Sequence, residues 1–465
     1  MNVAFDQTDP KSIESYAKKL EGKSLRGTLL NKGVPVSVVN DRDRGNFGSL
    51  LERHYFELPV NNESVPDFTR AGVELKATPV KRLKNGNLVS KERLVFGMID
   101  FMKIHKEEFE TSAFLSKNAL VLLVFYLHEQ KVNVLDYIVQ LARLWGIPET
   151  DLPIIKNDWE KIVTKVRKGK AHEIMSGDTL YLEACTKAAN NKARRPQPFS
   201  DETAKPRALA LKARYMSELF RQLSEKKKWE SPDVEPIVKS IREYSSGKTF
   251  ENIVIERFRP FLGLPVSEIR KKLGLALESK QKDEFAWVAR AILGVKTKHI
   301  EEFEKAGVVM KTIQLKKSGM PKEDMSFPIF RYNEIINEKW DIAENNDTEI
   351  EAELKQHLEQ RFFFVVFRCE DVCKKPEERI LEKVMFWNMP EQDLEDHARK
   401  VWEETIKRIN TGKAHQLTKK SEDPVVHVRP HAKNGADTIP TPKNGMLVKK
   451  CFWLDKKYIQ KQVRS

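Results

Sequence analysis

Residues 66–76 read PDFTRAGVELK, and the alternation that begins in this stretch runs on to residue 80. Alternating apolar and polar residues predict a β-strand that has one face against a core. Successive side chains of a strand point to opposite faces, so we expect Glu74 and Lys76 on one face and Leu75 in the core. Such a strand is a rigid support for a site that needs fixed geometry.

Asp67 comes shortly before this strand, so its carboxylate can be brought beside Glu74 and Lys76. Two carboxylates can hold one or two Mg²⁺ ions, which polarise a phosphate and acidify a bound water. The lysine can stabilise the charge that develops on the phosphate or position the attacking water. An Asp, a Glu and a Lys at this spacing also arise by chance in a chain so rich in charge, so the motif alone does not decide the function.

The composition is that of a globular protein with a basic surface. The chain has 465 residues, of which 40% are hydrophobic and 32% charged, and its formal net charge is +14. This length predicts two or three domains. The positive charge favours a polyanionic partner, either nucleic acid or an acidic membrane surface, although a solvated lysine-rich face has the same composition.

The apolar runs at residues 119–127 and 362–367 are too short to cross a bilayer and are typical of buried strands. The first residues lack a basic flank followed by an apolar stretch, so we expect no signal peptide and a cytoplasmic protein. The four cysteines are too few and too scattered for a disulfide scaffold, and we expect them to be reduced. Cys369 and Cys373 lack a second ligand pair, which argues against zinc.

A repeat organises the chain. The second half repeats five features in the same order. Glu52-Arg53 recurs as Glu256-Arg257, Ala71-Gly72-Val73 recurs as Ala306-Gly307-Val308, and Lys76 recurs as Lys311. The apolar strand at Leu120 has its counterpart at Phe362, and Trp159-Glu160, which a GKAH string follows ten residues on, has its counterpart in Trp402-Glu403 with the same string. Repetition on this scale indicates a duplicated domain. The charged, proline-containing stretch SEKKKWESPDVEP suits a linker. We therefore predict domains at residues 1–225 and 237–465, joined by a linker at 226–236.

The second copy departs from the first at the acidic motif. The positions that match Asp67, Glu74 and Lys76 hold Glu302, Val309 and Lys311. A valine in place of the strand glutamate removes one metal ligand, so we expect the second domain to be an inactive partner of the first.

Residues 40–52 (NDRDRGNFGSLLE), Asp67-Phe68 and residues 72–81 (GVELKATPVK) closely resemble the MutH family of DNA endonucleases. That family comprises the mismatch-repair enzyme that nicks GATC and related type II restriction endonucleases. One intact and one degenerate copy in a single chain resemble the restriction branch, which cuts before the G of GATC. The resemblance covers essentially the whole chain. It implies two tandem α/β domains of the PD-(D/E)xK, MutH type, each a mixed sheet flanked by helices.

The resemblance also implies particular site residues. Asp67, Glu74 and Lys76 match the catalytic core, Glu52 matches a helix-borne glutamate at the metal site, and Lys117 matches a second catalytic lysine. In the second half Glu256 takes the place of Glu52, and Glu359 takes that of Lys117. Without the resemblance we would take Glu52 for a surface helix residue and Lys117 for a charge at the start of a strand.

Residues 185–190 (CTKAAN) resemble the loop that reads GATC base edges in the major groove. Cys185 stands there where arginine is expected, whereas the second half keeps the fuller form at Arg429. The DNA contacts that the resemblance implies are Thr186, Lys187, Arg429, Pro430, His431, Lys449 and Lys450, with Arg194, Arg195, Lys212 and Arg214 as phosphate contacts. The repair enzyme's methyl-sensing tyrosine aligns with Ala210, so we expect methylated adenine not to block cleavage.

The hypothesis is a type II restriction endonuclease that cuts double-stranded DNA at GATC with Mg²⁺, with the second domain as a DNA-binding effector. A single active site per chain predicts self-association on DNA or cleavage of the strands in sequence, and a cognate methyltransferase should be encoded nearby. Two alternatives stay open: a strand-specific nicking endonuclease of mismatch repair, and a non-catalytic GATC-binding regulator.

Overall fold

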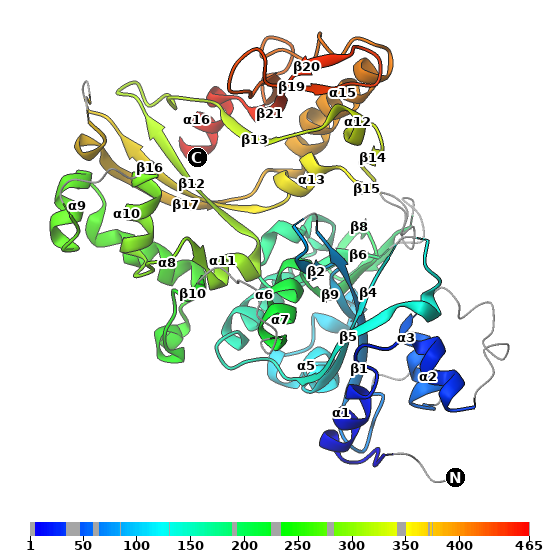
Figure 1. Ribbon diagram of the computed structural model, residues 1–465. Helices are drawn as coiled ribbons and strands as arrows, with labels where there is room; N and C mark the ends of the chain where they lie inside the picture. The colour runs from blue at the N-terminus through cyan, green and yellow to red at the C-terminus, as the bar shows by residue number, and fades with distance from the viewer. Residues whose placement is uncertain are drawn as a thin grey trace. The chain divides into compact units, whose positions relative to one another are not determined.

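The computed structural model describes residues 5–33, 47–58, 65–83, 85–129, 131–187, 193–224, 234–276, 283–341, 350–370, 373 and 375–464. They form two compact units, which Figure 1 colours along the chain. The first unit is Met1–Pro232, Val238–Thr249 and Glu301–Gly307, and the second is Asp233–Ile237, Phe250–Ile300 and Val308–Ser465. The predicted linker falls mostly outside the described residues. Residues 238–249 and 301–307, which lie beyond the predicted boundary, pack with the first unit.

The first unit contains two main sheets. The first sheet has the order β2 (Leu88–Ser90), β1 (Glu74–Arg82), β4 (Val121–Leu127) and β5 (Ile138–Trp145). The second has the order β3 (Leu94–Met98), β9 (Arg207–Leu211) and β6 (Leu182–Thr186), and β7 (Arg195–Gln197) pairs with β8 (Ser200–Ala204). The helices are α1 (Pro10–Lys18), α2 (Leu25–Asn31), α3 (Phe47–Leu50), α4 (Phe101–Ile104), α5 (Ala113–Asn118), α6 (Leu152–Arg167), α7 (Ala213–Leu223) and α11 (Glu301–Ala306).

The first sheet is mixed, as predicted: β1 runs parallel to β4, and β4 runs antiparallel to β5. Leu75 of β1 packs in a core cluster with residues of α1, α2 and α3. Helix α1 begins where the sequence indicates, because Asp9 accepts hydrogen bonds from the backbone N–H groups of Lys11 and Ser12 and Pro10 holds the first helical position. Among the described residues, no helix combines the length and the apolar character that a membrane span requires.

The second unit repeats this plan. Its first sheet has the order β12 (Val308–Leu315), β16 (Arg361–Arg368) and β17 (Ile380–Trp387), and its second has the order β13 (Met325–Ile329), β21 (Lys450–Leu454) and β18 (Val426–Pro430). Short pairs are formed by β10 (Val234–Glu235) with β11 (His299–Ile300), β14 (Glu338–Lys339) with β15 (Ile350–Glu351), and β19 (Thr438–Pro440) with β20 (Met446–Val448). The helices are α8 (Phe250–Phe258), α9 (Val266–Lys272), α10 (Glu284–Ile292), α12 (Tyr332–Ile335), α13 (Glu353–Leu358), α14 (Glu391–Asp393), α15 (Lys400–Asn410) and α16 (Lys456–Arg464).

The strand registers bear out the repeat. Strand β12 runs parallel to β16 as β1 runs to β4, and β16 runs antiparallel to β17 as β4 runs to β5. The two GKAH strings follow α6 and α15, and their glycines, Gly169 and Gly412, have φ values of 68° and 76°. Only glycine adopts this left-handed conformation freely, which explains why both helices end at a glycine.

The acidic motif of the second half does not form a site in the second unit. Glu302 lies in α11, which belongs to the first unit, and its carboxylate accepts a hydrogen bond from the backbone N–H of Val238 at 2.8 Å. Val309 and Lys311 lie on β12 of the second unit. Burial lowers the pKa of Lys311.

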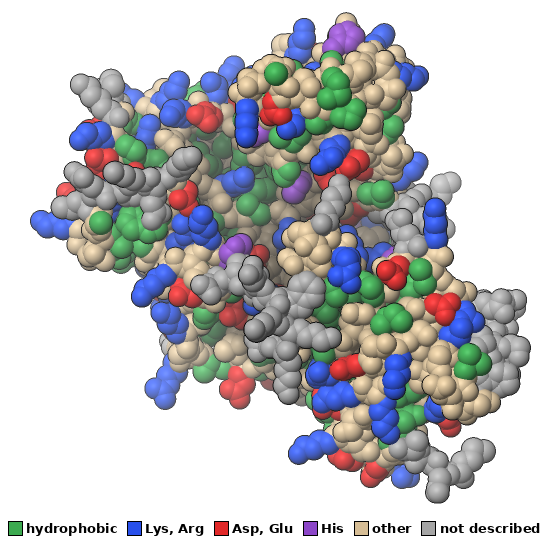
Figure 2. All heavy atoms as spheres, viewed as in Figure 1, with side chains coloured by type: hydrophobic (Ala, Val, Ile, Leu, Met, Phe, Trp, Pro, Cys, Tyr) green, Lys and Arg blue, Asp and Glu red, His purple; other side chains and the backbone are tan. Residues whose placement is uncertain are grey.

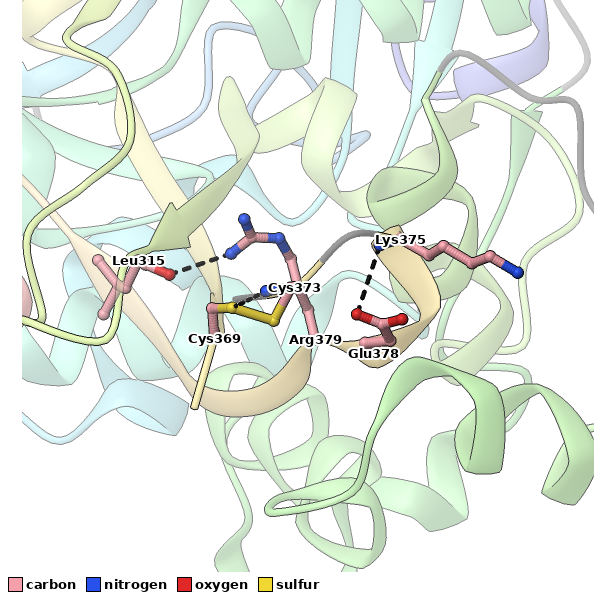
Figure 3. Close-up of a disulfide and its surroundings, with 6 residues drawn as sticks. All are labelled: Leu315, Cys369, Cys373, Lys375, Glu378 and Arg379. Carbon is pink, nitrogen blue, oxygen red and sulfur yellow. Dashed lines mark hydrogen bonds between the residues drawn. A yellow bond between two sulfur atoms is a disulfide. The ribbon is translucent and has the colours of Figure 1, made fainter. Parts of the chain in front are cut away.

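Cys369 and Cys373 form a disulfide (Figure 3), which corrects the expectation that all four cysteines are reduced. Cys369 directly follows β16, and its Cα atom lies 5.8 Å from that of Cys373, within the range that a disulfide spans without moving the backbone. Arg379 donates a hydrogen bond to the Leu315 carbonyl close by. Cys185 and Cys451 are free and buried.

Glu338 gives the second unit a pH-dependent stability. Burial raises the pKa of Glu338 to about 7, although Trp402 Nε1 and the backbone N–H of Glu353 donate to its carboxylate at 3.1 and 3.3 Å. The usual value is 4.5, so between about pH 4.5 and 7 the folded unit binds more protons than the unfolded chain, and the free energy of unfolding falls as the pH rises.

We therefore expect Glu338→Gln to stabilise the second unit by about 2–3 kcal/mol at pH 8 and to have little effect at pH 4. Urea unfolding followed by tryptophan fluorescence at both pH values measures this difference. An equal effect at pH 4 and pH 8 would show that Glu338 does not hold its proton in the folded protein.

Candidate active site

Glu74 is the centre of the candidate site. It is the first residue of β1, stands opposite Val121 of β4, and is only 1% exposed. Its Oε1 atom lies 2.8 Å from Lys76 Nζ and 3.5 Å from Lys117 Nζ. Both lysines keep about a quarter of their side chains exposed, at 22% and 24%. The buried carboxylate therefore holds two ammonium groups at the edge of solvent.

A tight turn brings Asp67 to this carboxylate. Phe68 and Val73 form an isolated antiparallel bridge, and Gly72 between them has a φ of 66°. The Asp67 carboxylate accepts a hydrogen bond from the backbone N–H of Leu75 at 2.8 Å, and the backbone N–H of Asp67 donates to Glu74 Oε2 at 3.3 Å. These two reciprocal bonds fix Asp67 beside the start of β1.

Glu52 reaches the same place from a different element. It lies in a π-helical turn, Leu51–Tyr55, that continues α3, and such turns are often found at functional sites. Burial raises the pKa of Glu52 to about 6, and the charges of Asp67 and Glu74 add to the rise. Burial and the Glu74 charge likewise raise the pKa of Asp67. The three carboxylates thus repel one another in a partly buried place.

Such crowding fits a divalent cation. Three oxygen ligands of like charge are a chemically suitable set for a hard metal ion, which would relieve their repulsion. Among the described residues, however, no group of three or more His, Cys, Asp or Glu side chains already has the spacing of a metal centre. Glu74 is engaged with Lys76 and Lys117 instead, so the ligand set of Glu52, Asp67 and Glu74 stays a prediction.

Lys117 comes from the last turn of α5, just before β4. In the second unit the strand register places Phe362 opposite Val309, as Val121 stands opposite Glu74. Counting back four residues from each strand position matches Lys117 to Leu358, one residue before the predicted Glu359. The second unit lacks the lysine under either match.

The predicted DNA contacts of the second unit gather on β18, β21 and the turns beyond them. Arg429 is bound to the carboxylate of Asp324, and its guanidinium lies 4.8 Å from the centre of the Trp453 ring. His431 also lies against Trp453, with 5.3 Å between the ring centres. Lys449 pairs with Asp437, whereas Lys450 is half-buried and donates to the Ala414 and His415 carbonyls at 3.3 and 3.4 Å. Pro430 is exposed at the end of β18.

The predicted contacts of the first unit are less closely grouped. Thr186 ends β6 and is exposed, and Lys187 follows it, but the remainder of the predicted reading loop lies outside the described residues. Arg194 and Arg195 are exposed at β7, and Arg214 is exposed at the start of α7. The ammonium of Lys212 donates to the Thr179 carbonyl at 2.6 Å, an anchoring contact within the unit.

Two charged pairs that were not predicted from the sequence lie at the second sheet of each unit, β3-β9-β6 and β13-β21-β18. Arg93 precedes β3 and pairs with the buried Glu183 of β6 at 3.3 Å, and Asp324 precedes β13 and pairs with Arg429. A glutamate within the otherwise apolar string LEAC was the available signal for the first pair. The net charge of the chain did not point to either pair, because Lys and Arg side chains are spread over the visible face with Asp and Glu among them (Figure 2).

Comparison with known proteins defines the class. A family model described as MutH, DNA mismatch repair enzyme MutH, matches residues 56–158. The chain is 30% identical to the DNA mismatch repair protein MutH of Shewanella amazonensis over 46% of this chain and 96% of that protein, and 29% identical to that of Vibrio vulnificus over 40% and 80%. The protein is therefore a site-specific endonuclease with a MutH-like α/β fold.

The whole chain has a more specific relative. It is 34% identical to the type II restriction enzyme Sau3AI of Staphylococcus aureus over 98% of both chains. The chain belongs to the family of this restriction enzyme, and restriction endonucleases of this type generally use a divalent metal ion.

Proposed function

We propose that this protein is a type II restriction endonuclease that hydrolyses double-stranded DNA at 5′-GATC-3′ with Mg²⁺ and cuts before the G to leave 5′ overhangs. The observation that carries the proposal is the buried Glu74, which holds Lys76 and Lys117 beside Asp67. This arrangement occurs at the first residue of β1, and the matching position of β12 holds valine. Catalysis is therefore assigned to the first unit.

The residues of the site have separate roles. Asp67, Glu74 and Glu52 would hold the metal ion, which when bound polarises the scissile phosphate and acidifies a water. Lys76 lies close enough to Glu74 to be fixed in place, and its partial exposure lets it reach a phosphate oxygen or the attacking water. Lys117 would add a second positive charge on the same side. The hydrogen bond from Leu75 keeps Asp67 from turning away.

The second unit is proposed to bind DNA and to act as an allosteric effector. It keeps Arg429 and His431 against Trp453, whereas it lacks the strand glutamate and the second lysine of the catalytic site. Arginine is well suited to guanine, because its guanidinium donates to both major-groove acceptors of that base. One catalytic site per chain further implies that two chains associate on DNA or that the strands are cut in sequence. A cognate methyltransferase encoded nearby would protect the host.

The test is cleavage of short duplexes that contain GATC or a single-base variant of it, with Mg²⁺ or with no divalent ion. We expect cuts on both strands of the GATC duplex only with Mg²⁺, and about 5- to 150-fold slower cleavage of each variant, since one mismatched base pair costs about 1–3 kcal/mol. Nicks in one strand would favour the repair-type activity. Tight binding without cleavage would favour a regulator.

A further inference from the structure

Each unit carries one half-exposed arginine that is tied to a buried carboxylate on its second sheet. In the first unit Arg93 is 46% exposed and pairs with Glu183, whose side chain is 4% exposed. In the second unit Arg429 is 47% exposed and pairs with Asp324, whose side chain is also 4% exposed. A buried carboxylate with a half-exposed arginine fixes the guanidinium toward solvent without covering it.

The strand registers show which positions correspond. Leu94 of β3 and Leu182 of β6 both stand opposite Leu211 of β9, and Met325 of β13 and Val426 of β18 both stand opposite Leu454 of β21. Arg93 precedes Leu94 as Asp324 precedes Met325, so these two positions match.

The same registers align the strand that carries the second charge of each pair. Glu183 matches His427, and Cys185 matches Arg429. The charges have therefore exchanged strands. The first unit has its arginine before the edge strand and its carboxylate on β6, whereas the second unit has its carboxylate before the edge strand and its arginine on β18.

Arg93 also interacts with Cys185, the residue at the position of the missing arginine. Burial raises the pKa of the Cys185 thiol, and Arg93 opposes this rise through its charge and through a hydrogen bond to the thiol. Arg93 thus contacts both Glu183 and Cys185, the residue that stands where Arg429 stands in the second unit. The small side chains of Ala208 and Ala210 pack beside Cys185 in a buried cluster, and Val95 packs against them.

We propose that Arg93 is a specificity-determining residue of the catalytic unit, where its guanidinium hydrogen-bonds N7 and O6 of a guanine in the recognition sequence. The inference rests on the proposed cleavage of GATC and adds the residue that reads its guanine in the first unit. Glu183 is the positioning residue of this pair, as Asp324 is for Arg429. The departure at Cys185 is then a relocation of the arginine to the start of β3, across β9 from β6, and not a loss of base reading.

The experiment measures kcat/KM of the full chain on a GATC duplex and on the same duplex with 7-deazaguanine, which lacks the N7 acceptor. The wild type is expected to cut the 7-deaza duplex about tenfold more slowly than the normal one, and Arg93→Ala to cut the normal duplex about 10- to 100-fold more slowly than the wild type. Arg93→Ala should show a smaller further loss on the 7-deaza duplex than the wild type does, because only Arg429 of the second unit is left to use N7. Arg93→Lys keeps a positive charge for Glu183 and can still donate to N7, so it should keep part of the cleavage rate and of the sensitivity to 7-deazaguanine, whereas a misfolded variant would lose both.

Two variants complete the design. Cys185→Arg introduced into Arg93→Ala should restore at least part of the cleavage rate and of the sensitivity to 7-deazaguanine, since it places an arginine where the second unit has one. Arg26→Lys is the matched control, because Arg26 is also a partly exposed arginine in an ion pair, with Asp136 at 2.6 Å, and lies on α2. It should behave as the wild type.

The two ways to fail are distinct. A wild type that does not cut the GATC duplex contradicts the proposed function itself. The other failure is a wild type that cuts the GATC duplex while the Arg93 variants are slowed by 7-deazaguanine by the same factor as the wild type. That result overturns the role of Arg93 and leaves the proposed function intact.

Discussion

Replacing Glu74 with glutamine is expected to slow DNA cleavage by at least about 10³-fold, because it weakens the proposed ligand set of the metal ion that would stabilise charge at the reacting phosphate. Glutamine has nearly the same size, so the core around β1 should remain packed. The loss of charge removes the ion pairs that Lys76 and Lys117 form with this side chain. DNA affinity measured with Ca²⁺ in place of Mg²⁺ should change by less than about tenfold, since most of it comes from phosphate and base contacts elsewhere.

Val309 of the second unit provides the matched control. Val309→Ala alters the position that corresponds to Glu74 and should leave the cleavage rate unchanged, because no catalytic group depends on it. Single-turnover cleavage of a labelled duplex measures both variants. A Glu74→Gln protein that cuts at the wild-type rate would remove Glu74 from the mechanism, and a Val309→Ala protein that loses activity would place catalysis in the second unit.

The second large effect concerns Lys305, whose side chain is buried within the first unit. Lys305 Nζ lies 2.9 Å from both carboxylate oxygens of Asp151 and 2.9 Å from Glu301, and the Tyr215 hydroxyl donates to Asp151 at 2.8 Å. Lys305→Ala leaves the buried Asp151 carboxylate without its cation, so we expect the free energy of unfolding of the first unit to fall by about 3–5 kcal/mol. Urea unfolding, with hydrogen exchange of α6 and α11 as a local probe, measures the loss.

The exposed pair of Lys103 and Asp100 gives the comparison. Their side chains are 81% and 50% exposed, so Lys103→Ala should change the stability by less than about 1 kcal/mol. Adding Asp151→Asn to Lys305→Ala should recover part of the stability, because it removes the uncompensated charge. If Lys305→Ala lowers the free energy of unfolding no more than Lys103→Ala does, then the pair of Lys305 and Asp151 does not hold α11 to the rest of the first unit.

Much of the architecture could be predicted because its signals are local. Alternation fixes β1, Asp9 and Pro10 fix the start of α1, and the recurring GKAH strings reveal the duplication. Other features depend on contacts between residues far apart in sequence. Strands β2 and β3, for example, are separated by only three residues, yet they belong to different sheets.

The candidate site could be predicted only in part from the sequence, for the same reason. The sequence could place Glu74 and Lys76 on one face, because that follows from the period of a strand. It could not show that Lys117 shares the same carboxylate oxygen, nor that Arg93 contacts the residue at which an arginine is missing. Nor could it show that α11 packs with the first unit, since Lys305 and Asp151 are 154 residues apart.

The central claim is that one catalytic site, in the first unit, cuts both strands at GATC. The most direct measurement is to digest an unmethylated plasmid with Mg²⁺, using the wild type and Glu74→Gln, and to sequence every new DNA end. The account predicts double-strand ends before the G of GATC for the wild type and intact plasmid for Glu74→Gln. Ends at other sequences, or the same ends produced by Glu74→Gln, would contradict it.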